Sequence, residues 1–164
     1  MELAGSCHCR VVRFTVQSHT PYPYMRCFCS ICRKTAGGGG YAINIMGVAE
    51  TLTVSGEDQI STYHARLYDR HDPQRVETSL GVRHFCRQCG SALWVWDPRW
   101  PELVHPFASA IDTTLPRPPQ YWNIFLADKP DWVVVPKGPD DHDVMDYPTE
   151  SIEQWHRRLG LWQP

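Results

Sequence analysis

Residues 86–90 read Cys86-Arg87-Gln88-Cys89-Gly90, and this short segment is the most informative part of the sequence about the fold. Two cysteines separated by two residues can direct both thiolates at one metal ion, and a glycine after them lets the backbone turn beneath it. The pattern is typical of a zinc knuckle, which needs two more ligands to complete a tetrahedral site. Further thiolates must therefore come from distant parts of the chain.

The sequence has seven cysteines, and the other five lie in two groups closer to the N-terminus. These groups are Cys7-His8-Cys9 and Cys27-Phe28-Cys29-Ser30-Ile31-Cys32. An odd number of closely spaced cysteines fits a disulfide framework poorly, because such frameworks use paired cysteines and form in oxidising compartments. The arrangement indicates thiolate ligation of metal.

The spacing allows two divisions of the cysteines. The first gives a closed four-thiolate site, here called the closed cluster, made of Cys7, Cys9, Cys86 and Cys89. It leaves an open three-thiolate site, here called the triplet, made of Cys27, Cys29 and Cys32. The second division builds a zinc ribbon from Cys27 or Cys29 with Cys32, Cys86 and Cys89, and leaves Cys7 and Cys9 unused. Spacing alone leaves both divisions open.

The two sites of the first division would differ in chemistry. Four thiolates give a bound zinc a formal site charge of about −2, which makes the ion a poor Lewis acid. Three thiolates leave an open face that can bind and deprotonate an incoming thiol. The triplet is therefore the candidate catalytic site.

The length and charge of the chain limit the number of domains and the kinds of partner that we expect. A chain of 164 residues suits one domain, since roughly 100–200 residues per domain is usual. The net charge is −2 and no run of Lys or Arg occurs, so nucleic acid is not expected as a partner. No apolar stretch approaches the ~20 residues that span a bilayer, and the N-terminus has no apolar signal segment. We expect a cytoplasmic protein without a membrane partner, and the sequence leaves its oligomeric state open.

Short β-branched and alternating segments predict a mainly β fold. The strand candidates are residues 11–16, 25–27, 41–45, 52–54, 60–67, 81–85, 92–96, 104–108 and 122–126. The one good helix candidate is 151–159, where Ser151 and Gln154 can form a capping box. Residues 136–146 resemble a linker, because they are acidic and contain Pro and Gly. We expect a single zinc-binding domain over 1–164, in which 136–164 is an extension whose helix packs on the rest.

The three cysteine blocks resemble the signature blocks of a known family. They read Gly5-Ser6-Cys7-His8-Cys9, Cys27-Phe28-Cys29-Ser30-Ile31-Cys32-Arg33-Lys34 and Phe85-Cys86-Arg87-Gln88-Cys89-Gly90-Ser91. In order and spacing, all seven cysteines are similar to those of the glutathione-dependent formaldehyde-activating enzymes, a family that includes centromere protein V. The likeness covers about residues 1–130.

This resemblance implies a β-tent fold that holds two zinc ions per chain, one in the closed cluster and one on the triplet. It thereby favours the first division. It also implies an S-(hydroxymethyl)glutathione synthase-like activity, the reverse of a carbon–sulfur lyase reaction, with Cys27, Cys29 and Cys32 as the catalytic residues. The implied partners are a small thiol such as glutathione and an aldehyde, formaldehyde. Two departures leave the true substrate open: a polar insertion at residues 66–77, and Tyr121-Trp122-Asn123 where the family often shows a His-containing strand.

Other interpretations explain the same cysteines. A non-catalytic zinc scaffold would bind a protein partner through its sheet, and a fourth protein ligand at the second ion would favour it. A thiol or metal sensor would lose the looser ion when glutathione competes for it. Near the ligands, Arg33 and Lys34 can clamp substrate carboxylates or remain solvated charges, and His8 and His84 can move protons or act as spacers.

Overall fold

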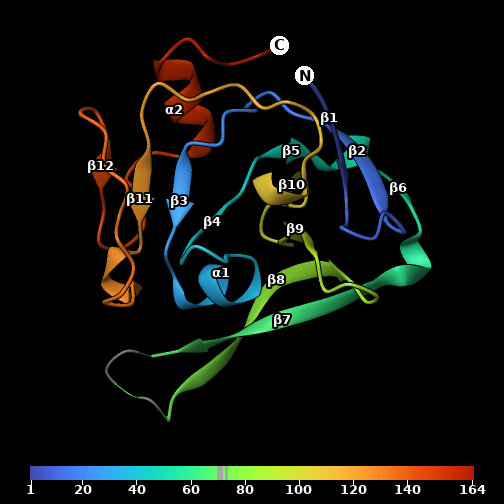
Figure 1. Cartoon of the computed structure of the whole chain (residues 1–164), viewed down its shortest axis with the longest axis horizontal. Coiled ribbons are helices and arrows are strands. Elements are labelled where there is room, and N and C mark those ends of the chain that lie inside the picture. Colours follow the sequence, from blue (N-terminus) through green and yellow to red (C-terminus); the bar gives the residue numbers. More distant parts are fainter. Residues whose placement is uncertain (70–71, 73) are drawn as a thin grey trace.

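The computed structural model describes residues 1–69, 72 and 74–164. As predicted, the protein is mainly β, with a short helix near the C-terminus. In this described part the strands form three hydrogen-bonded sheets, and Figure 1 shows how they surround the centre of the molecule.

The first sheet is antiparallel, and its order is β1 (Glu2–Ser6), β2 (Arg13–Gln17) and β6 (Thr53–Ser55). Strand β1 was not predicted, because Ala4 and Gly5 are weak β-formers. Gly5 is required by packing: a Cβ there would lie 2.4 Å from the Phe14 ring and 2.5 Å from the Ala110 carbonyl oxygen. Pairing with β2 therefore overrides the weak propensity of β1.

The second sheet is antiparallel and carries the longest strands. Its order is β5 (Gly47–Val48), β10 (Leu103–Pro106), β9 (Ala92–Trp96), β8 (Val76–Cys86) and β7 (Ile60–Tyr68). Figure 1 shows the β7–β8 hairpin projecting beyond the rest of the molecule. Part of the predicted polar insertion, 66–77, lies in these two strands, where Tyr68 pairs with Val76. Residues 70, 71 and 73 of the insertion lie outside the described residues.

The third sheet is mixed, and its order is β12 (His142–Asp143), β11 (Trp122–Ile124), β3 (Met25–Cys27) and β4 (Ala42–Ile43). The segment 136–146, expected to be linker-like, is mostly irregular but has polar contacts with this sheet. Asp141 Oδ2 lies 3.5 Å from Arg26 Nη1, and Asn123 Nδ2 donates a hydrogen bond of 2.9 Å to Asp143 Oδ1. The acidic side chains therefore anchor this segment to the sheet.

The remaining regular elements of the described residues are helices. The predicted C-terminal helix is confirmed as α2 (Ile152–Arg158), and Ser151 and Gln154 form its capping box. The Trp155 ring of α2 is fully buried and stacks on Tyr24 at a centroid distance of 3.7 Å. A second α-helix, α1 (Ser30–Thr35), was missed, because six residues are too few to show apolar periodicity. The 3-10 helices of the described part are η1 (Ala49–Thr51), η2 (Glu57–Gln59), η3 (Ala108–Ala110) and η4 (Leu126–Asp128).

Two further features of the described structure concern the cysteines and the helices. Four of the cysteines belong to the central hydrophobic core, namely Cys7, Cys27, Cys32 and Cys86. Among the described residues, no helix combines the length and the apolar character needed to cross a membrane.

Candidate functional site

The four sulfurs of the closed cluster lie within 4.8 Å of one another. Cys9 Sγ is 3.5 Å from Cys7 Sγ and 3.8 Å from Cys86 Sγ. Sulfurs about 2.3 Å from a tetrahedral zinc would lie about 3.8 Å apart. The donor set and its size therefore fit a zinc ion.

The first turn of the closed cluster follows β1. The Cys7 carbonyl oxygen accepts a hydrogen bond from Arg10 N at 2.9 Å, and Val12 N donates to Cys7 Sγ at 3.3 Å. Arg10 has a positive φ of 61°, which curls the backbone back toward β2. An N–H that points at a sulfur favours the thiolate form, the form that binds metal.

The second turn lies between β8 and β9. The Cys86 carbonyl oxygen accepts a hydrogen bond from Gly90 N at 2.8 Å, and Gly90 has a φ of +73°. The glycine after the knuckle thus serves the turn geometry that the sequence predicted. His8 N donates to Ser91 Oγ at 3.0 Å and so connects the two turns.

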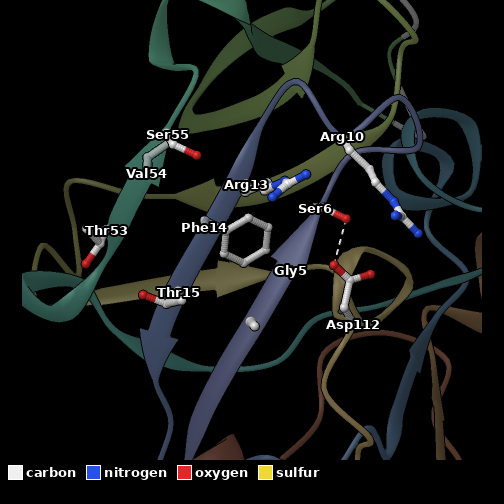
Figure 2. A pocket seen from close by; sticks show the side chains of 11 residues that line it. Gly5, Ser6, Arg10, Arg13, Phe14, Thr15, Thr53, Val54, Ser55 and Asp112 are labelled. Atoms are coloured by element: carbon white, nitrogen blue, oxygen red, sulfur yellow. Dashed lines mark hydrogen bonds between the residues drawn. The ribbon is translucent and has the colours of Figure 1, made fainter.

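Asp112 holds the end of β1 just before the first ligand. Figure 2 shows Ser6 and Asp112 facing each other, with a hydrogen bond of 2.6 Å from Ser6 Oγ to Asp112 Oδ2. Asp112 N also donates to the Ala4 carbonyl oxygen at 2.8 Å. These contacts fix the direction in which the chain approaches Cys7.

The triplet is built from one continuous segment, the end of β3 and the first turn of α1. Its three sulfurs lie within 4.8 Å of one another, and within the described part of the chain this group has no fourth His, Cys, Asp or Glu member. Cys27 and Cys32 are buried, and Cys29 is partly exposed. Cys29 is the N-cap of α1, because its sulfur accepts a hydrogen bond of 3.3 Å from Cys32 N.

Crowding divides the protons unequally within the triplet. Hydrogen bonds from Cys27 and from Cys32 lower the pKa of Cys29, whereas hydrogen bonds to Cys29 and Cys32, together with burial, raise the pKa of Cys27. Three neighbouring thiols cannot all ionise unless a cation offsets their charge. Such a donor set is suited to a metal ion, because metal binding displaces the thiol protons.

Arg83 of β8 is a functional candidate that the sequence analysis missed. Its Nη2 lies 3.7 Å from Cys32 Sγ, and its Nη1 donates to Thr35 Oγ1 at 3.3 Å. Arg83 is 51 positions from Cys32, so only the folded sheet brings them together. An alternating strand pattern at 81–85 was visible in the sequence, but it carried no sign that Arg83 would face α1.

A groove of about 660 Å³ separates α1 from the closed cluster. Arg33 and Lys34 line its α1 side, and His8 and Arg10 line the other. Arg33 Nε is buried and has no hydrogen-bond partner among the described residues. The charged side chains of the groove are therefore mainly basic, with Asp112 as an acidic member, and the groove borders the closed cluster at Cys7 and the helix that carries Cys32. The second histidine named above, His84, lies apart from this groove.

Known proteins resemble this chain over most of its length. A family model described as glutathione-dependent formaldehyde-activating enzyme matches residues 2–128. The chain belongs to this family. A Halomonas elongata protein, provisionally named a glutathione-dependent formaldehyde-activating enzyme, is 58% identical over 161 residues, which cover 98% of each chain.

A solved structure adds a likeness in fold. The crystal structure of a Rhodobacter sphaeroides protein matches with a TM-score of 0.51 and 24% sequence identity. The match covers 71% of this chain and 92% of the other. For this member of the glutathione-dependent formaldehyde-activating enzyme family, the sulfurs gather in space as four and three, and the ribbon grouping is not formed.

Proposed function

We propose that this protein is an enzyme that joins glutathione to formaldehyde. In the reaction a carbon–sulfur bond forms between the thiol sulfur and the aldehyde carbon, the S–H bond breaks, and its proton ends on the former aldehyde oxygen. The product is S-hydroxymethylglutathione, so the reaction is that of a carbon–sulfur lyase in reverse. Membership of the family and the provisional name of the Halomonas elongata relative support this substrate pair.

The observation that carries the proposal is the three-sulfur composition of the triplet. We propose that each cysteine group holds one zinc ion. A zinc ion held by three thiolates keeps one coordination position for a substrate atom and lowers the pKa of a thiol bound there. A non-catalytic scaffold would be expected to complete the second site with a fourth protein ligand, and the described part of the triplet has three.

The chain's own residues supply charge and position. Three thiolates exceed the charge of a divalent ion by one, and the Arg83 guanidinium beside Cys32 offsets part of this excess. In the groove, Arg33, Lys34 and Arg10 are placed to bind the carboxylates of glutathione.

The same proposal extends to the domain organisation and the cellular compartment of the protein. We treat residues 1–164 as one β-tent unit, in which 136–164 packs on the zinc-binding part. The reducing cytoplasm expected from the sequence would keep all seven cysteines available as ligands.

The direct test is the rate of S-hydroxymethylglutathione formation from glutathione and formaldehyde. We expect the zinc-loaded protein to exceed the spontaneous rate in proportion to its concentration, and Cys32→Ser to lose at least 100-fold of this acceleration, roughly the contribution of one catalytic group. Ser30→Ala is the matched control, because Ser30 is exposed in the same segment and offers no thiolate. The absence of any acceleration by the wild type would reject the proposed function.

A further inference from the structure

A second pocket, distinct from the basic groove, lies beside the triplet. Its volume is about 370 Å³, and it is lined mainly by carbon atoms of Tyr63, Phe85, Ala92 and Phe107. Arg83, whose guanidinium lies 3.7 Å from Cys32 Sγ, is also part of its wall. Arg83 therefore connects the apolar pocket to the proposed reaction centre.

The apolar pocket and the basic groove adjoin each other. Both are lined by Thr35, Gly90 and Ala92. The groove offers cations, whereas the pocket offers rings and methyl groups, so the two match the two halves of an amphipathic molecule. An anionic thiol would occupy the groove and would leave the pocket to the group attached to its sulfur.

The size of the pocket does not suit formaldehyde. A water molecule occupies about 30 Å³ of liquid, so the volume of the pocket corresponds to roughly a dozen water-sized groups. Formaldehyde has one carbon and one oxygen, and it gains little from apolar walls. The charged ends of a thiol such as glutathione would lose hydration in the pocket, where the guanidinium of Arg83 already contacts Cys32 Sγ and Thr35 Oγ1.

We infer that the pocket receives the carbon chain of an aldehyde larger than formaldehyde, so that the substrate class is the adduct of an anionic thiol with an apolar aldehyde. This inference rests on the proposed function. The bonds are the same for the longer aldehyde: a carbon–sulfur bond forms, the S–H bond breaks, and the proton passes to the aldehyde oxygen. The carbon chain contributes binding through burial of apolar surface.

His84 is one of a few polar residues that line this pocket, together with Thr35, Thr62 and Arg83. Its ring is half-buried and stacks on Trp94 at a centroid distance of 5.1 Å. Its Nδ1 is a buried atom with no hydrogen-bond partner in the described part of the chain. A pocket with few polar groups among apolar walls is typical of small-molecule sites.

The test uses S-alkylglutathiones, which carry a stable thioether and cannot release an aldehyde. We expect the affinity of the zinc-loaded protein, measured by calorimetry, to rise about fourfold for each methylene that becomes buried, from S-methyl to S-propyl to S-hexyl. The heat-capacity change of binding should become more negative along the same series. An affinity that is independent of chain length would overturn the inference.

A pair of variants tests whether the gain in affinity per methylene arises in this pocket. Thr62 lines the pocket and is exposed on β7, so Thr62→Leu should fill the space and remove most of the gain per methylene. Thr78→Leu makes the same change on an exposed part of the same hairpin, away from the pocket, and should keep the gain. Equal gains in the two variants would place the alkyl group elsewhere and overturn the inference.

The enzymatic assay separates this inference from the proposed function. Acceleration with formaldehyde, combined with chain-length-independent binding, would contradict the inference alone. No acceleration with any aldehyde would contradict the proposed function.

Discussion

Arg83 is the side chain that connects the triplet to the central sheet. It contacts a sulfur of the triplet and the end of α1 at once, through Cys32 and Thr35. A cation at this position stabilises neighbouring thiolates, and the partial exposure of Arg83 reduces that effect. Its role is therefore one of positioning and charge.

Replacing Arg83 by Met should weaken zinc binding at the triplet by roughly threefold to tenfold, the range of a partly exposed charge-assisted contact. The measurement is zinc release to a chromogenic chelator, in which the triplet and the closed cluster give separate phases. Arg87→Met is the control, because Arg87 is exposed beside Cys86. Identical release curves for the two variants would show that Arg83 does not act on the triplet.

A substitution at Gly90 tests the backbone geometry of the second turn of the closed cluster. A Cβ at Gly90 meets no atom within 4 Å, so the cost of Gly90→Ala comes from its φ of +73° alone. We expect a loss of about 1 kcal/mol in the free energy of unfolding of the zinc-loaded protein, measured in denaturant. Gly38→Ala is equally open but has no positive φ, and it should be neutral or slightly stabilising. A neutral Gly90→Ala would count against the turn geometry described for Cys86–Gly90.

At the scale of elements, the helices show where sequence reasoning succeeds and where it stops. The capping box and apolar face of α2 are local signals, so the helix could be predicted from 151–159. Helix α1 could not, because a cysteine is its N-cap and its stability comes from the segment that holds the triplet. Strand β1 likewise depends on its partner, since Gly5 fits only against Phe14. Contacts distant in sequence, such as Arg83 with Cys32, left no local signal at all.

Helix α2 is held to the body by a buried histidine. His156 Nδ1 donates to the Ile152 carbonyl oxygen at 2.7 Å, and its Nε2 accepts a hydrogen bond of 3.3 Å from Tyr22 N. Burial lowers the pKa of His156 below its ordinary value. A protonated Nε2 would face a donor, so the neutral ring is the form that fits.

The hydrogen bonds of His156 predict that the free energy of unfolding depends on pH. Because the folded pKa of His156 is lowered, its contribution is complete above the unfolded value of about 6.5 and is lost as the pH falls through the folded pKa. The difference in unfolding free energy between wild type and His156→Gln should therefore shrink as the pH falls below about 6.5. Since both proteins carry the same cysteines, the comparison cancels acid effects on the metal sites. A difference that stays constant or grows on acidification would contradict the prediction.

At the scale of the whole molecule, the two cysteine groups have different structural duties. The closed cluster joins distant segments, with Cys9 and Cys86 separated by 77 positions, whereas the triplet lies within six consecutive residues. A cross-link that closes so long a loop stabilises a fold by roughly 4 kcal/mol, by analogy with disulfides. Loss of the closed cluster should therefore threaten the fold, and loss of the triplet should spare it.

Cys86→Ser should accordingly lower the unfolding free energy by several kcal/mol or prevent folding, whereas Cys32→Ser should remain folded and lose one zinc. Circular dichroism and denaturant unfolding of both variants, purified with zinc, measure this difference. Equal stabilities of the two variants would contradict the division of duties.

The most direct measurement is a crystal structure of the zinc-loaded protein with anomalous data at the zinc edge. We expect two zinc peaks per chain, one surrounded by the four closed-cluster sulfurs and one by the three triplet sulfurs and a ligand that is not a protein side chain. A single zinc ion, or a fourth protein side chain bound to the zinc at the triplet, would refute the proposed pair of sites.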